Sequence, residues 1–141
     1  MEGVNFYFND VKVFRLEKTL LRNTIYSIAK DKGFRCGNIN IIFCTDEFLL
    51  RMNKDYLDHD YYTDIITFDY SGKDEISGEL YISVERVKEN AANFDVKFGI
   101  ELVRVIFHGI LHLVGYKDKE ESEQAVMREK EEYYLSIYGK N

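Results

Sequence analysis

Two histidines and an aspartate in one short segment have the spacing of a metal-binding site. His108 and His112 stand four residues apart in FHGILHLVGYKD (107–118), and Asp118 follows six residues later. Side chains at i and i+4 of a helix project from the same face, so both imidazoles can reach one point. Three protein ligands suit a catalytic metal ion, which keeps a further position open for water or substrate. The pattern predicts one metal ion bound by His108, His112 and Asp118, and metal-assisted hydrolysis as its chemistry.

The segment that carries the histidines has the composition of a buried helix. Residues 97–114 are apolar on nearly every side, which is typical of a helix inside the core. Gly115 follows at the position where a glycine with positive φ ends a helix. The resulting turn can swing Asp118 back toward the imidazoles. The alternative is a pair of ordinary core histidines bonded to backbone carbonyls, and the added glycine and carboxylate favour the metal.

Zinc proteases with the motif H-E-x-x-H-x-x-G-x-x-H share this spacing, which gives a second interpretation. In those enzymes the glutamate after the first histidine is the general base. Gly109 occupies that position in this chain. Without an adjacent carboxylate, proteolysis is the weaker hypothesis, and it stays open at this point.

The rest of the chain alternates between strand and helix patterns. Periodicity predicts strands at 4–8, 38–45, 64–70 and 76–83, and helices at 14–33, 46–57, 84–94, 97–114 and 119–139. Ser83 can cap the helix at 84–94. Because two predicted strands follow each other without a helix between them, the class expected is α+β. A length of 141 residues suits a single domain spanning 1–141.

Composition limits the cellular location and the classes of protein that fit this chain. No apolar run approaches the roughly 18–20 residues of a membrane span, and the N-terminus does not resemble a signal peptide. Cys36 and Cys44 are too few for a disulfide framework, so both are interpreted as small apolar residues of a cytoplasmic protein. The net charge of −6 argues against a protein that coats nucleic acid.

The charge is unevenly distributed along the chain. Residues 11–36 carry seven basic and two acidic side chains, whereas residues 37–76 are strongly acidic. The basic stretch is either a solvated helix face or a surface that follows phosphates beside an acidic site. In the second case Lys18 and Arg22 would contact substrate.

Several motifs resemble one known family. HGILHLVGY (108–116) resembles the H-G-x-L-H-L-x-G-Y signature of the YbeY family of bacterial rRNA maturation endoribonucleases. MNKDYLDHDYYTDIITF (52–68) is similar to the family's L-N-x-x-Y-R-x-x-D-K-P-T-D-V-L-S-F, and GELYIS (78–83) to its G-D-I-V-I-S. Together these segments span roughly residues 45–120, in the order that the family has them.

The resemblance implies a zincin-like α+β domain in which a mixed four-stranded sheet packs with helices and the metal site lies on a buried helix. It also implies single-strand endoribonuclease activity in rRNA maturation and ribosome quality control, with one zinc ion as cofactor. The partners expected are RNA, small-subunit ribosomal RNA in particular, and the ribosome or its proteins. Neither DNA nor a membrane is expected. His59 and Asp64 fall in the segment that the resemblance places near the site, and are candidates for substrate contact.

Three departures from the family pattern affect these expectations. Asp118 stands where the family has a third histidine ligand, and Lys117 replaces the aspartate before it. Two histidines with a carboxylate also suit iron(II), manganese or cobalt. Leu57 replaces an arginine that is thought to assist the RNA chemistry. Because this arginine is missing, a second function stays open: a non-catalytic ribosome-binding factor that keeps a structural metal.

Overall fold

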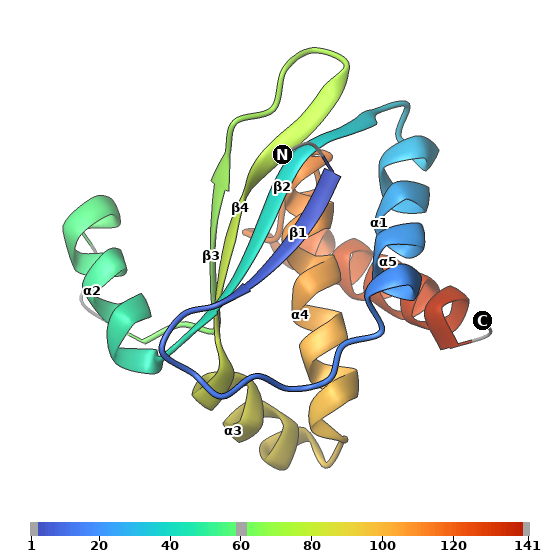
Figure 1. Ribbon diagram of the computed structural model, residues 1–141. Coiled ribbons are helices and arrows are strands. Elements are labelled where there is room, and N and C mark those ends of the chain that lie inside the picture. Colours follow the sequence, from blue (N-terminus) through green and yellow to red (C-terminus); the bar gives the residue numbers. More distant parts are fainter. Residues whose placement is uncertain (1–2, 59–61, 140–141) are drawn as a thin grey trace.

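A mixed four-stranded sheet lies at the centre of the fold (Figure 1), in a computed structural model that describes residues 3–58 and 62–139. Its strands are β1 (Gly3–Phe8), β2 (Arg35–Cys44), β3 (Ile65–Asp69) and β4 (Glu75–Ser83), in the spatial order β1-β2-β4-β3. The β1–β2 and β2–β4 pairs are parallel, and the β3–β4 pair is antiparallel. The α+β class and the mixed sheet expected from the sequence are confirmed.

The described residues also form five helices around this sheet. Three of them, α1 (Lys18–Asp31), α4 (Phe98–Leu113) and α5 (Glu121–Gly139), gather on one side of the sheet (Figure 1). On the other side, α2 (Asp46–Leu57) packs over a small second apolar cluster, while α3 (Val84–Phe94) follows β4 at its end. As expected, Ser83 caps α3, where its Oγ accepts a hydrogen bond from the Arg86 N–H at 3.1 Å.

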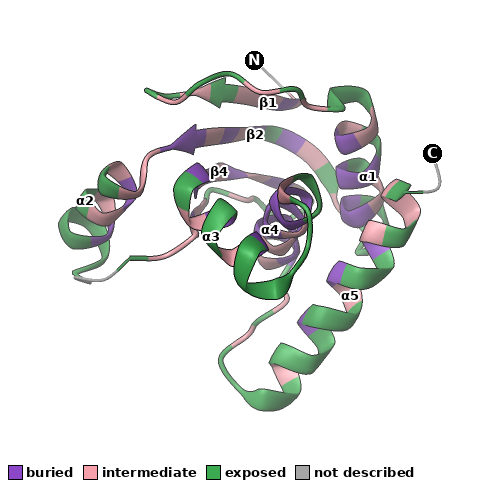
Figure 2. Ribbon diagram, turned by 90° about the horizontal axis from the view of Figure 1, so that it is seen from below, coloured by how far each residue is buried: buried purple, intermediate pink, exposed green. Residues whose placement is uncertain are grey.

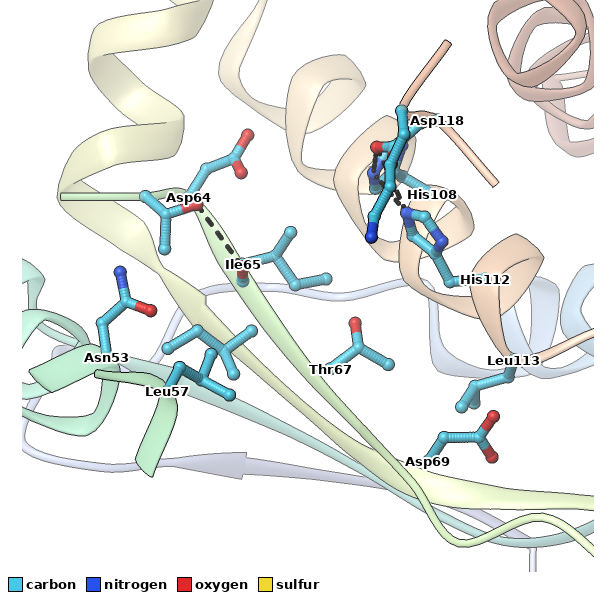
Figure 3. A pocket seen from close by; sticks show the side chains of 13 residues that line it. Asn53, Leu57, Asp64, Ile65, Thr67, Asp69, His108, His112, Leu113 and Asp118 are labelled. Atoms are coloured by element: carbon cyan, nitrogen blue, oxygen red, sulfur yellow. Dashed lines mark hydrogen bonds and ion pairs between the residues drawn. The ribbon is translucent and has the colours of Figure 1, made fainter. Parts of the chain in front are cut away.

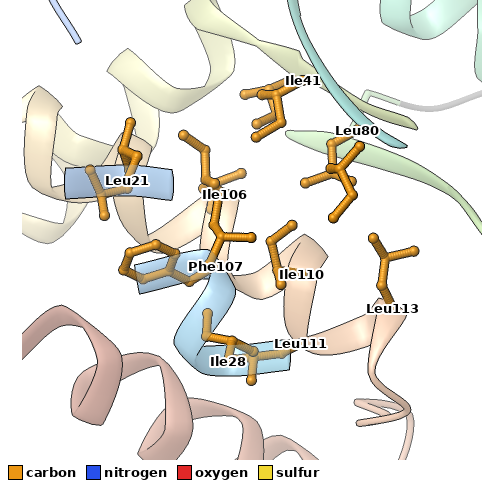
Figure 4. Packing of buried hydrophobic residues seen from close by; sticks show 14 of the residues in the cluster. Leu21, Ile28, Ile41, Leu80, Ile106, Phe107, Ile110, Leu111 and Leu113 are labelled. Atoms are coloured by element: carbon orange, nitrogen blue, oxygen red, sulfur yellow. The ribbon is translucent and has the colours of Figure 1, made fainter. Parts of the chain in front are cut away.

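The main core forms around α4, which is enclosed on nearly all sides. Strand alternation turns residues such as Ile41 and Leu80 toward this helix, and Leu21 and Ile28 of α1 meet it from the other direction (Figure 4). Figure 2 shows the contrast with α5, whose buried positions form only a narrow stripe. A helix packed in this way is a rigid support, because core side chains interlock at close to crystal density. The two histidines of α4 therefore start from a fixed backbone.

The helix predicted at 14–33 begins later, at Lys18, and this prediction was wrong at its start. Residues before Lys18 form an extended connection from β1, in which the ring of Phe14 packs edge-on against Phe8 and Phe43 at centroid distances of 4.9 and 5.1 Å. A helix beginning at residue 14 would remove that ring from its aromatic partners. Tertiary packing thus overrides local periodicity here.

The two cysteines are free, as the sequence predicts. Burial, with a smaller contribution from Asp46, raises the pKa of the Cys44 thiol to about 12. Cys36 is half-buried, and burial with the nearby charge of Glu75 raises its pKa to about 11. Both thiols stay protonated at neutral pH and pack as small apolar groups. Among the described helices, none has the length and apolar character needed to cross a bilayer.

Candidate metal centre

Helix α4 presents His108 and His112 one turn apart on a single face. Their rings meet at nearly a right angle with centroids 4.7 Å apart, and the two Nε2 atoms lie 3.1 Å from each other. From Val105 to Leu113 the other positions of the helix are buried, so the two imidazoles are the polar groups of this half of α4. The i, i+4 spacing thus places both rings at one point, as the sequence predicts.

A glycine turn brings the third side chain to the same point. Gly115 has a φ of +108°, its N–H bonds to the His112 carbonyl at 3.0 Å, and the Tyr116 N–H bonds to the Leu111 carbonyl at 3.0 Å. These two bonds form a Schellman motif, which ends the helix and reverses the chain. Asp118 then lies with Oδ2 3.3 Å from the Nε2 atoms of both His108 and His112 (Figure 3).

The three donor atoms fit one metal ion. They lie within 4.8 Å of one another, with pairwise separations of 3.1, 3.3 and 3.3 Å. A tetrahedral ion with bonds of about 2.0–2.1 Å separates its donors by about 3.3–3.4 Å. An ionised carboxylate and the bare nitrogen of a neutral imidazole are both acceptors, so their close approach is favourable only with a cation or a proton among them. The residues present therefore suit a divalent metal.

An open hollow of about 610 Å³ borders the centre and is large enough for part of a polymer chain. The three candidate ligands form one wall, β3 forms the floor, and Leu57 at the end of α2 lies on the opposite side (Figure 3). Leu57 occupies the position of the family's arginine. Lys119 is the cationic side chain that lines this hollow among the described residues, and the sequence did not single it out.

Asp64 lies in the same hollow, at the entry to β3. Its Oδ2 accepts a hydrogen bond from the Asn90 amide at 3.2 Å, and its backbone carbonyl accepts one from the Ser83 N–H at 2.9 Å. Burial raises the pKa of the Asp64 carboxyl, although the positive charges of Arg104 and His108 oppose the rise. Asp64 therefore combines a structural hydrogen bond with a place beside the candidate ligands.

Two of the other predicted contacts, Lys18 and Arg22, are not at the centre. His59 lies outside the described residues. Lys18 and Arg22 do not line the hollow, because α1 lies toward the β1 edge of the sheet while the hollow borders β3 at the other edge. Arg22 instead donates from Nε to the Val4 carbonyl at 2.9 Å and lies over the Phe6 ring at 5.4 Å. The expectation of a basic face continuous with the metal cleft is not met by these two residues.

Gly109 has a role that sequence reasoning did not find. A Cβ built on Gly109 would lie 2.6 Å from Leu80 Cδ2 and 2.8 Å from Ile65 Cδ1. The position after His108 therefore faces the sheet, and any larger residue there would force the side chains of Leu80 and Ile65 to shift. A glutamate at this position would have to displace Leu80 and Ile65, and glycine supplies no general base, so the structure does not favour the protease alternative.

Behind His108 lies a chain of charged groups that sequence reasoning also missed. His108 Nδ1 and Glu131 Oε2 are 2.6 Å apart, and the other Glu131 oxygen accepts from Arg104 at 2.9 Å. Burial lowers the pKa of His108, but the hydrogen bond and charge of Glu131 outweigh it and hold that pKa above its ordinary value. The bond to His108 and the charge of Arg104 likewise outweigh burial at Glu131, whose pKa is lowered.

A signal for Glu131 is present in the sequence. Met127, Glu131 and Tyr134 recur at helical spacing and are the buried residues of α5. An acidic residue on the apolar stripe of an otherwise solvated helix is unusual unless it has a partner in the core. Such a residue near a predicted metal site is a candidate for a supporting role.

The fold and this centre together define a class: zincin-like metal-dependent hydrolases of α+β architecture. A profile described as "Endoribonuclease YbeY" matches residues 7–139. The endoribonuclease YbeY of Flavobacterium psychrophilum is 48% identical over 122 residues, covering 86% of this chain and 87% of the relative. That of Cytophaga hutchinsonii is 46% identical over 137 residues, covering 96% of each. The solution structure of TM1509 from Thermotoga maritima has a TM-score of 0.65 and 28% identity, covering 96% of this chain and 88% of that chain.

The chain belongs to the YbeY family of endoribonucleases. The resemblance inferred from the histidine motif is thereby confirmed, and the enzyme is a hydrolase that acts on RNA.

Proposed function

We propose that this chain is a single-domain enzyme, residues 1–141, that cleaves single-stranded RNA with one metal ion held by His108, His112 and Asp118. The observation that carries the proposal is the convergence of these three side chains, at 3.1–3.3 Å, on the wall of an open hollow. We further propose small-subunit ribosomal RNA as the natural substrate and the cytoplasm as the location, with the ribosome or its proteins as partners. The names of the relatives support RNA as the class of substrate.

The three candidate ligands and the metal ion have separate roles in this proposal. When bound, a divalent ion would polarise a phosphoryl oxygen and make a water molecule more acidic. The two imidazoles and the Asp118 carboxylate would hold that ion from one side and leave its other side open to the hollow. We propose zinc; iron(II), manganese and cobalt suit the same ligands. Asp118 adds a negative charge that a third histidine would not, which makes the centre less positive than in relatives with three histidines.

The hollow would hold the RNA next to that centre. Lys119 can pair with a phosphate, since it is a cation on the rim within the same hollow as the ligands. Asp64 can hydrogen-bond to a ribose hydroxyl, because its carboxyl group lines the same hollow and a hydroxyl can donate to it. We keep His59 as a further candidate for substrate contact on its position in the sequence alone.

Removing the metal tests the function directly. We expect metal-depleted protein to lose cleavage of a single-stranded RNA and to regain it when zinc, manganese, iron(II) or cobalt is added back. The measurement is product formation on a gel with single-stranded RNA, duplex RNA, single-stranded DNA and a casein peptide in parallel. Only single-stranded RNA should be cut. A different result would favour a ribosome-binding factor with a structural metal: the metal-depleted protein unfolds, and the metal-loaded protein cleaves no RNA.

Lys119 and Lys18 offer a matched pair for locating the phosphate contacts. We expect Lys119→Ala to weaken RNA binding and to flatten its dependence on salt by roughly one unit of log–log slope, the loss of about one phosphate contact. Lys18→Ala removes the same charge on α1, toward the opposite edge of the sheet, and should leave the slope unchanged. Fluorescence anisotropy with a labelled RNA at several salt concentrations measures both. The reverse result would mean that RNA contacts the basic stretch 11–36 and does not contact Lys119.

A further inference from the structure

A chain of alternating charges, buried at its two glutamates, connects α4 and α5 directly behind His108. Arg104 forms a two-bond pair with Glu101, from Nε at 2.8 Å and from Nη2 at 2.6 Å, and donates from Nη1 to Glu131 Oε1 at 2.9 Å. Glu131 Oε2 lies 2.6 Å from His108 Nδ1. The side chains of Glu101 and Glu131 are only 2% and 4% exposed. The chain thus runs from the core to one of the candidate metal ligands.

Stability alone does not account for this arrangement. Burying ionised groups costs free energy that their mutual attraction often fails to recover, and apolar replacements of buried pairs are commonly neutral or stabilising. Here every link also has a fixed direction, because a guanidinium can only donate hydrogen bonds and an ionised carboxylate can only accept them. The order of the groups therefore dictates where protons lie.

The direction of the chain determines the tautomer of His108. Arg104 occupies one oxygen of Glu131, so the other oxygen faces Nδ1 as an acceptor. Nδ1 must then carry the proton, and in the neutral imidazole Nε2 is left with a free lone pair. That nitrogen is the one that lies 3.3 Å from Asp118 Oδ2 and 3.1 Å from His112 Nε2.

We propose that Glu131 is a positioning residue, oriented by Arg104, that holds His108 in the Nδ1–H tautomer and so presents a free Nε2 to the metal. A carboxylate behind a metal-binding histidine fixes both the ring orientation and the proton in this manner. The proposal rests on the proposed function only in taking His108 as a metal ligand. It assigns to Glu131, Arg104 and Glu101 a task in preparing the site before any metal arrives.

The substitution Glu131→Gln tests this proposal directly, because it replaces one carboxylate oxygen with an NH₂ group and keeps the shape of the side chain. Arg104 still donates, so the glutamine oxygen must stay turned to it and the amide NH₂ faces His108 Nδ1. Nδ1 then has to accept, which moves the imidazole proton to Nε2, where it occupies the metal position. We therefore expect Glu131→Gln to reverse the tautomer of His108.

The first measurement uses metal-free protein and needs no RNA. Long-range ¹H–¹⁵N spectra of the imidazoles distinguish the two tautomers by nitrogen shift. They are recorded at about pH 9, more than two units above the ordinary histidine pKa of about 6.5. We expect Nδ1–H for His108 in the wild type and Nε2–H in Glu131→Gln. The control is Glu132→Gln, the same change at the exposed neighbouring position, which should leave the spectrum as in the wild type.

The second measurement is zinc affinity by competition with a chelator. We expect Glu131→Gln to weaken binding about 100-fold, the upper end of what supporting residues contribute, and Glu132→Gln to have no effect. The comparison is then repeated in a background with Glu101→Leu and Arg104→Met, which removes that buried pair as a unit. In that background no arginine holds the glutamine oxygen, so the amide group can rotate and turn its oxygen to His108. Glu131→Gln should then weaken zinc binding by less than about tenfold.

Each outcome decides for or against the proposal. An Nε2–H tautomer in the wild type, an unchanged tautomer in Glu131→Gln, or an equal loss of affinity in both backgrounds would overturn it. If the tautomer reverses and zinc binding weakens as expected while no variant cuts RNA, the positioning role stands and the proposed endoribonuclease function fails instead.

Discussion

Alanine in place of Asp118 is expected to remove both metal binding and RNA cleavage. The carboxylate supplies one of three donor atoms and the ligand set's negative charge, with Oδ2 3.3 Å from each imidazole Nε2. A metal contributes several kcal/mol to stabilising charge in the transition state. A loss of about 4 kcal/mol corresponds to a rate roughly a thousandfold lower. Single-turnover cleavage with the metal content of the same sample measures both effects.

Asp69→Ala is the matched control for this prediction. Asp69 is also a carboxylate that lines the hollow, but it stands at the end of β3, where its Oδ1 accepts a hydrogen bond from the Ser71 N–H at 2.9 Å. Its removal should leave metal content at the wild-type level and slow cleavage only slightly. Equal losses in the two variants would mean that the acidity of the hollow matters and that Asp118 is not a ligand. Retention of metal by Asp118→Ala would point to a different third donor.

Gly109→Glu is expected to prevent stable folding. The new side chain would start 2.6 Å from Leu80 Cδ2 and 2.8 Å from Ile65 Cδ1, so these side chains or α4 itself would have to shift, and a carboxylate would be placed against apolar groups. Overpacking alone costs about 1–3 kcal/mol, and an unpaired buried charge adds several more. The sum, more than about 4 kcal/mol, is a large part of the stability of an ordinary domain. Urea unfolding followed by circular dichroism measures the loss.

Gly99→Glu is the corresponding control on the same helix. Gly99 lies in the first turn of α4, where an added Cβ would meet nothing within 4 Å. A glutamate there gains helix propensity and a favourable interaction with the helix dipole, so stability should stay the same or rise by up to about 1 kcal/mol. A folded Gly109→Glu protein that cleaves peptides would reopen the protease interpretation. A folded one that still cuts RNA would show that the helix–sheet contact is more tolerant than its geometry indicates.

Local spacing was enough to predict the candidate centre. The i, i+4 separation of His108 and His112 places both rings on one helix face whatever that helix packs against. Gly115 likewise marks the end of the helix, because a positive φ is accessible to glycine at low cost. These relations span about ten residues, so the sequence carries them without reference to the rest of the fold.

Relations between distant segments were not accessible in this way. The link from Glu131 to His108 joins residues 23 positions apart, and its geometry depends on how α5 packs against α4. The start of α1 depended on aromatic partners in β1 and β2, and the place of Arg22 depended on which sheet edge its helix covers. The sequence does not show which sheet edge a charged helix covers until the elements are packed, so it left open whether the basic stretch borders the site.

Gly109 separates the two kinds of information most clearly. The sequence by itself determined that no general base follows His108, since glycine has no side chain. The tertiary structure adds that α4 packs so closely on β3 and β4 that a Cβ at this point would meet Leu80 and Ile65 at under 3 Å. The sequence also determined the family and the metal-binding spacing, through short-range patterns that survive any arrangement of the elements. The contact of Glu131 with His108, the floor of the hollow and the place of Lys119 beside the candidate ligands came from contacts between elements. The free energies of such contacts depend on distances of a few ångströms that no local pattern encodes.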